Sequence, residues 1–145
     1  MTGNAELTAE EMQQVLREEF GCDAELRAME NASLDVFRAG TVYLICTSTY
    51  GEGEVPDGAK PLYVALCQRR PNLSAIRYAV FGLGDSNYPD TFNFGGKRFD
   101  EILSDLGAQR LGERGRHDIR SDVQPWDFGK DWVRAWYVAQ RNALG

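Results

Sequence analysis

The sequence has 145 residues, of which 43% are hydrophobic and 26% are charged, and this composition fits one globular domain and excludes a disordered or fibrous chain. The 22 acidic residues outnumber the 16 basic ones, so the net charge of -6 argues against a nucleic-acid binder and favours a basic partner. The longest apolar runs, 42–46 and 63–67, are too short to span a bilayer, and no secretory signal follows Met1. We therefore expect a cytoplasmic protein without membrane contact.

The first half of the chain alternates between helical and extended patterns. Apolar residues within 5–16 recur at helical spacing, and Gly21 can take the left-handed conformation that ends a helix. Residues 24–29 alternate weakly, which predicts a short strand, and 31–40 reads as a loop with a helical turn. The continuous run TVYLICT at 41–47 is typical of a strand that is buried on both faces.

The second half continues this alternation. Residues 61–68 and 99–106 have helical patterns, and 128–139 forms a last amphipathic helix whose tryptophans anchor the core. The segment RYAVF at 77–81 predicts a second buried strand, and 109–111 predicts a short one. Helices alternating with apolar strands predict an α/β fold, with a doubly wound parallel sheet covered on both faces, in a single domain that spans the chain.

Loops after the strands are the candidate sites, because ligands of open α/β sheets bind outside the carboxyl ends of the strands. The segment 2–6 lies before the first helix and combines a hydroxyl, a glycine and a helix start, which predicts an anion site or only a helix cap. Glycine-rich loops that carry Tyr50 and Tyr88 follow the two buried strands, and glycines let the backbone approach a flat ligand. Stacking on each tyrosine adds about 1 kcal/mol beyond area burial.

Three motifs together, TGNAE at 2–6, STYGEGEVPD at 48–57 and FGLGDSNY at 81–88, resemble the flavodoxin-like FMN-binding family. The similarity is to short-chain flavodoxins of the MioC type and to the flavodoxin domains of diflavin reductases. It implies the strand order 2-1-3-4-5 with FMN at the switch point. It also implies a central strand before the phosphate loop, which the sequence lacks, so we expect that the structure begins upstream of Met1, that another segment fills the slot, or that FMN affinity is impaired.

The resemblance assigns roles to residues of the three motifs. The 2–6 segment holds the FMN phosphate, Tyr50 and Tyr88 stack on opposite faces of the ring, and Asp118 approaches the cofactor. No catalytic residue and no metal ligand is expected. The expected cofactor-binding residues are Thr2, Gly3, Asn4, Ala5, Glu6, Ser48, Thr49, Tyr50, Gly51, Gly53, Leu83, Gly84, Asp85, Tyr88, Phe92 and Asn93.

Three functions remain open for the sequence. The first is a monomeric one-electron carrier that exchanges electrons with a basic partner, such as an NAD(P)H-dependent flavin reductase, and with an acceptor. The second is the FMN module of a larger NADPH-dependent reductase, and the third is a non-redox binding module that has lost FMN. Carboxylates in or beside the two loops would disfavour an anionic reduced flavin and attract a basic partner. Alternatively, they serve only solubility. These residues are Glu52, Glu54, Asp57, Asp85 and Asp90.

The remaining reactive side chains predict no further chemistry. Three cysteines without CxxC spacing predict free thiols in a reducing compartment, and Cys46 at the end of a buried strand predicts packing. His117, the sole histidine, has no nucleophile motif nearby, so we expect a solvated loop residue and no hydrolase.

Overall fold

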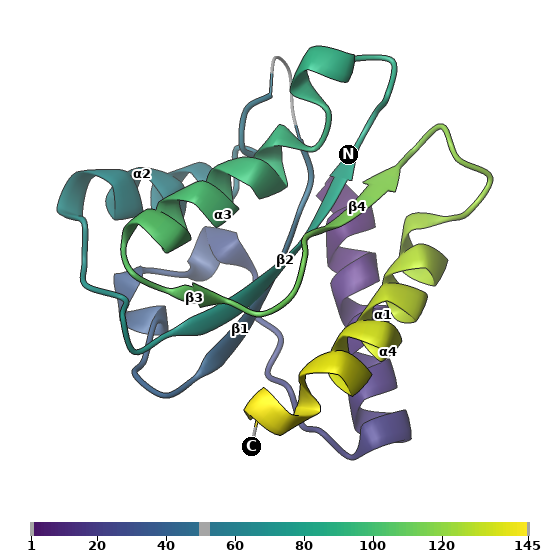
Figure 1. Ribbon diagram of the computed structural model, residues 1–145. Helices are drawn as coiled ribbons and strands as arrows, with labels where there is room; N and C mark the ends of the chain where they lie inside the picture. Colours follow the sequence, from purple (N-terminus) through teal and green to yellow (C-terminus); the bar gives the residue numbers. More distant parts are fainter. Residues whose placement is uncertain (1, 50–52, 145) are drawn as a thin grey trace.

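The computed structural model describes residues 2–49 and 53–144 and contains a parallel sheet between two layers of helices (Figure 1). Three single-turn helices connect the longer elements, at Met29–Asn31, Leu34–Val36 and Pro89–Thr91. The longer elements are α1 (Thr2–Phe20), β1 (Val42–Thr47), α2 (Lys60–Arg69), β2 (Arg77–Gly84), α3 (Phe94–Asp105), β3 (Gln109–Arg110), β4 (Gly115–Asp118) and α4 (Pro125–Leu144).

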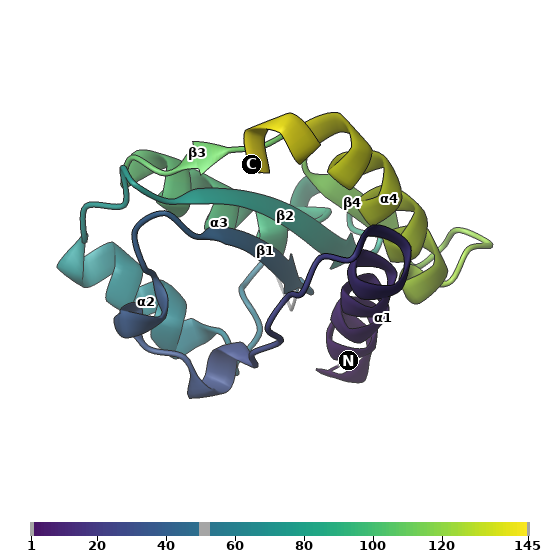
Figure 2. The same ribbon diagram turned by 90° about the horizontal axis from the view of Figure 1, so that it is seen from below.

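Strand β2 is the centre of the sheet, and all of its pairings are parallel. It pairs with β1 along one edge and, along the other, with β3 near its start and β4 near its end. Figure 2 shows β1 and β2 side by side across the middle of the molecule. The order of these strands matches the 3-4-5 part of the predicted order, and within the described residues β1 is paired along one edge only.

The two faces of β2 bury different cores. Tyr78 and Val80 pack with Phe99 under α2 and α3, whereas Phe81 and Leu83 face α1 and α4. Figure 1 shows these helix pairs on opposite sides of the sheet. The predicted α/β fold with helices on both faces is therefore confirmed. Of the tryptophans in the last helix, Trp136 is 7% exposed and Trp132 packs partly buried against the same core.

One strand prediction is wrong, and the end of another lies further along the chain than predicted. Residues 24–29 form no strand, because Leu26 is 42% exposed and the Ala24 carbonyl accepts a hydrogen bond from Gln13 Nε2 at 2.6 Å instead of a ladder bond. Strand β2 continues to Gly84, three residues beyond the predicted end, because 82–84 pair in register with β4.

Strand β4 was not predicted, and it corrects the interpretation of His117. Its side chains alternate between buried and exposed, with Gly115 and His117 inside and Arg116 outside. The His117 ring is 2% exposed, lies edge-on to Phe128 at a centroid distance of 5.6 Å, and has Nε2 2.6 Å from the Val123 carbonyl oxygen. The histidine is therefore a packed core residue rather than a solvated one.

The helices begin earlier than the apolar patterns predict. Helix α1 starts at Thr2, so the predicted phosphate loop 2–6 is the first part of the helix itself. Helix α3 starts at Phe94, five residues before its apolar stripe. The predicted end of α1 is confirmed, because Gly21 has φ +64° and the Cys22 N–H donates to the Leu16 carbonyl at 2.9 Å.

Candidate functional site

The amino terminus of α1 lies at the same end of the sheet as the carboxyl ends of β2 and β4 (Figure 1). Cys46, near the end of β1, donates from Sγ to the Ala5 carbonyl oxygen at 3.4 Å and so joins α1 to this end. Burial raises the pKa of the Cys46 thiol to about 12, which keeps it protonated, as the predicted packing role requires. A helix start and the strand ends therefore form one surface.

The first turn of α1 has the properties of an anion site. The opening N–H groups of a helix have no partner within it, and the helix dipole adds positive potential there. The first turn carries no acidic side chain, and a Cβ on Gly3 would meet no atom within 4 Å. Asn4 and Ala5 follow in the same turns, and Glu6 is exposed; the side chain of Thr2 lies outside the described part of the chain.

Residues 48–57, here called the β1 loop, continue from the end of β1. Tyr50 and Gly51, predicted to contact the ring, lie outside the described residues, as does Glu52. Ser48 is buried, and Gly53 has φ +95° and is covered by the Phe94 ring, whose Cδ2 would lie 2.8 Å from a Cβ at this position. The described parts of the loop are therefore packed against the start of α3.

Residues 85–92, here called the β2 loop, follow β2 and present Tyr88 to solvent. The Tyr88 side chain is 63% exposed, so its ring is available to a ligand, while Phe92 is half-buried. Asp118 Oδ1 accepts hydrogen bonds from the Ser86 and Arg120 N–H groups, both at 3.0 Å. The carboxylate expected to approach the cofactor therefore holds the β2 loop in place.

These hydrogen bonds also lower the pKa of Asp118, chiefly through Ser86. We expect Asp118→Ala to lower the free energy of unfolding by about 1–2 kcal/mol at neutral pH, because two N–H groups lose a charged acceptor. Since the pKa is lower in the folded chain, this stabilisation is present above the ordinary pKa of aspartate and is lost as the pH falls through the folded value.

Urea unfolding between neutral and acidic pH measures the difference in the free energy of unfolding between the unaltered chain and Asp118→Ala. The gap between the unaltered chain and Asp118→Ala should shrink as the pH falls below about 4. Asp122→Ala, an exposed change in the same connection, is the control and should have little effect. A gap that stays constant with pH would contradict the role given to the carboxylate.

The glycines of the FGLG motif make room for Asn93. A Cβ on Gly82 would lie 2.6 Å from Asn93 Oδ1, and one on Gly84 would lie 2.8 Å from the Asn93 backbone nitrogen. Asn93 is 1% exposed, has φ +58°, and donates from Nδ2 to the His117 carbonyl at 3.2 Å. Among the described residues, its Oδ1 finds no hydrogen-bond partner. Leu83, between the two glycines, is a core residue of β2.

Two basic residues, Lys60 and Arg120, neutralise part of the expected acidic rim, and the sequence reasoning missed Arg120. Lys60 pairs with Glu54 at 3.0 Å and lies 3.6 Å from Asp57. Arg120 Nε pairs with Asp85 Oδ1 at 3.1 Å. The sequence carries no local signal for the second pair, because its members are 35 positions apart, with α3, β3 and β4 between them. Glu54, Asp57 and Asp85 therefore act with partners, and their effect on a ligand is weaker than that of isolated charges.

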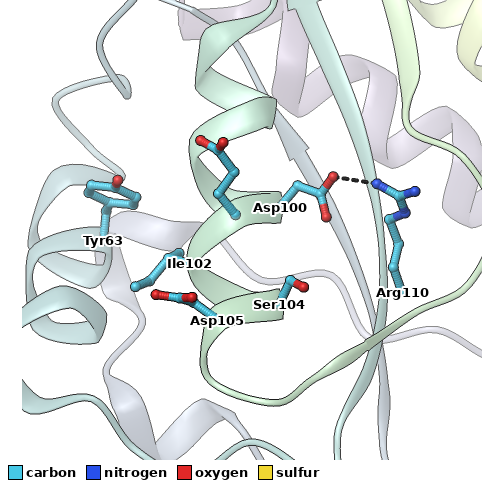
Figure 3. Close-up of a pocket in the computed structure, with 7 residues that line it drawn as sticks. Tyr63, Asp100, Ile102, Ser104, Asp105 and Arg110 are labelled. Carbon is cyan, nitrogen blue, oxygen red and sulfur yellow. Dashed lines mark hydrogen bonds and ion pairs between the residues drawn. The ribbon is translucent and has the colours of Figure 1, made fainter.

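A polar hollow lies away from this end of the sheet, along α3 (Figure 3). At its base, Asp100 accepts hydrogen bonds from the Tyr78 hydroxyl at 2.5 Å and from Arg110 at 2.6 Å. Burial and this carboxylate raise the pKa of Tyr78. Arg110 belongs to β3, which pairs with the start of β2, so this ion-paired network supports the opposite end of the sheet.

No group of three or more acidic, histidine or cysteine side chains in the described ranges is placed to hold a metal ion. In the same part of the chain, every helix is too short or too polar to cross a bilayer.

A parallel sheet with a helix start and two glycine-rich loops at its carboxyl end defines a nucleotide-binding α/β protein. The chain belongs to the flavodoxin family, whose model matches residues 1–125. It is 40% identical over 137 residues to flavodoxin YqcA of Pectobacterium carotovorum subsp. carotovorum, covering 92% of this chain and 87% of that protein. It is 33% identical over 134 residues to protein MioC of Escherichia coli strain K12, covering 92% and 88%.

The fold agrees with this membership. The structure is similar to that of a cysteine-to-alanine mutant of a flavodoxin from Pseudomonas aeruginosa, with a TM-score of 0.83 and 33% identity over 97% of this chain and 93% of that one. The resemblance inferred from the three motifs is thus confirmed. Flavodoxins bind FMN and carry electrons, so this chain is an FMN-binding flavoprotein of electron transport.

The described residues fit FMN on two observations. The first turn of α1 is free of carboxylates and open at Gly3, which suits a phosphate group. Tyr88 is an exposed aromatic ring at the end of β2, where it has no core to pack against.

Proposed function

We propose that this chain is a monomeric electron carrier that binds the FMN phosphate at the start of α1 and the flavin ring between the β1 and β2 loops. The observation that carries the proposal is the convergence of these three segments at one end of the sheet, joined through the Cys46–Ala5 contact. FMN supplies one-electron chemistry when it is bound. The chain's part is to hold the phosphate, orient the ring and leave one edge accessible to another protein.

The proposed cofactor-binding residues divide into two groups. Backbone N–H groups of the 2–6 segment hold the phosphate, with hydroxyl help from Thr2. Tyr50 and Tyr88 cover the ring, and the backbone around Gly51 and Gly53 faces its polar edge, with Thr49 alongside. The β2 loop contributes Asp85 and Phe92 on the other side, and Gly84 and Asn93 flank this loop at its two ends. Support comes from the exposure of Tyr88 and from the bonds that fix the β2 loop.

The proposed partners are a basic reductase, such as an NAD(P)H-dependent flavin reductase, and an electron acceptor. The net charge of -6 supports a basic partner, because opposite charge speeds encounter. The three cysteines are free, which supports a reducing compartment such as the cytoplasm. The 40% identity to a protein named as a flavodoxin supports the role of an electron carrier.

Reconstitution with FMN tests the proposal. Titration should quench flavin fluorescence and give a yellow protein that bleaches with dithionite. Riboflavin, which lacks the phosphate, should bind at least about ten-fold more weakly, because it forgoes charge-assisted hydrogen bonds at the helix start. Protein that stays colourless and leaves the fluorescence of both flavins unchanged would contradict the proposal and favour a non-redox binding module.

A further inference from the structure

Two hydrogen bonds join the start of α3 to the β1 loop. The Gly95 N–H donates to Thr49 Oγ1 at 2.9 Å, and Arg98 Nε donates to the Gly53 carbonyl oxygen at 2.6 Å. Thr49 and Gly53 stand on either side of residues 50–52, which lie outside the described part of the chain. Helix α3 therefore holds the β1 loop on both sides of the segment that contains Tyr50.

The Arg98 contact is strong for its kind. A charged guanidinium donates to a neutral carbonyl, and such bonds are stronger than those between two neutral groups. The Phe94 ring covers Gly53 from the same helix, and the Arg98 side chain is half-buried. The bond therefore lies in a partly desolvated position, where its loss is costly.

The same end of α3 also reaches the second strand and β4. Asn93, directly before the helix, fits against Gly82 and Gly84 of β2 and donates to the His117 carbonyl. The β2 loop begins immediately after Gly84. The start of α3 therefore lies between the two loops and sets their separation.

We propose that Arg98 is a positioning residue for the flavin ring site: by tying Gly53 to α3, it fixes the β1 loop relative to the β2 loop. This inference rests on the proposed function, because it concerns the ring site of that function. The residue acts through the loop backbone. The inference requires neither a direct contact between Arg98 and flavin nor an electrostatic effect of Arg98 on flavin.

Three variants separate position from charge. Arg98→Met removes the donor and the charge, while Arg98→Lys keeps the charge and lacks the Nε–H group. Lys97→Met is the matched control, because it removes one positive charge from the adjacent position; the Lys97 ammonium lies 4.7 Å from the Phe94 ring centroid. Urea unfolding of all three, compared with the unaltered chain, establishes that each is folded.

Both Arg98 variants should bind FMN and riboflavin about ten-fold more weakly, by the same factor for each flavin, because the phosphate contacts on α1 are unchanged. The midpoint potential of the bound flavin should shift in both. Lys97→Met should bind both flavins with an affinity within about two-fold of that of the unaltered chain. An Arg98→Lys variant that binds like the unaltered chain, or an Arg98→Met variant that binds like Lys97→Met, would overturn the inference.

Hydrogen exchange in the FMN-free protein gives a reading that needs no flavin. Amides of residues 53–57 should exchange faster in both Arg98 variants and at the ordinary rate in Lys97→Met, with α4 unchanged in all. Unaltered exchange at 53–57 would overturn the inference even where the unaltered chain binds FMN. An unaltered chain that binds no flavin would instead refute the proposed function and, with it, the ring site that Arg98 is inferred to organise.

Discussion

Replacing Tyr88 by alanine should weaken FMN binding by roughly 30-fold, or about 2 kcal/mol, because the flavin ring loses its stacking partner and one of its apolar faces becomes exposed to water. The Tyr88 side chain is 63% exposed, so its removal costs the fold little. The loss of affinity therefore reports on the ligand contact rather than on stability. The potential for full reduction should also rise, because the electron-rich face of tyrosine disfavours an anion beside it.

Fluorescence titration and a potentiometric titration check both expectations. Tyr88→Phe is the matched control, since it keeps the aromatic face and removes only the hydroxyl, and it should retain most of the affinity. An alanine variant with the affinity and potential of the unaltered chain would exclude stacking on Tyr88. The position of the ring would then have to be sought on other residues of the two loops.

Gly95→Ala should destabilise the fold by about 3 kcal/mol or more, a large part of the roughly 5–15 kcal/mol that holds a typical domain folded. A Cβ on Gly95 would overlap the carbonyl oxygen of Ser48 and lie 3.0 Å from its carbonyl carbon. These are backbone atoms, so no side-chain rotation relieves the overlap, and α3 must move away from the β1 loop. The gain of about 1 kcal/mol from alanine's better helix propensity is smaller.

Urea unfolding measures this cost. Gly58→Ala is a suitable control, because that glycine is exposed and its Cβ would lie 3.6 Å from Glu30, an ordinary contact. The free energy of unfolding of the control should lie within about 0.5 kcal/mol of that of the unaltered chain. Equal midpoints for the two variants would show that α3 and the β1 loop are not in the close contact described above.

The buried strands and most helices were predictable because their signals are local. Continuous apolar residues identify β1 and β2 whatever surrounds them, and Gly21 ends α1 through its own backbone conformation. Strand β4 was not predictable in this way. It buries a glycine and a histidine and exposes arginine, so neither apolar content nor β-branched residues mark it as a strand.

The site was predictable as a set of loops but not as a set of contacts. The described motif residues that follow β1 and β2 are where the sequence places them, at the carboxyl ends of these strands. The structure gives a reason for two of their glycines that the sequence does not show: Gly82 and Gly84 accommodate Asn93, and no pattern within FGLG reveals that neighbour. The bond between Arg98 and Gly53 joins residues 45 positions apart, so only the folded chain brings them together.

The interruption between β3 and β4 makes this edge of the sheet tolerant of extra length. Leu111 and Gly115 are buried on either side of it, while Gly112 and Glu113 are exposed between them. Each short strand pairs with its own stretch of β2. An inserted segment next to the exposed Glu113 would leave both ladders in register. The molecule can thus acquire a new appendage here while the cofactor end of the sheet keeps its geometry.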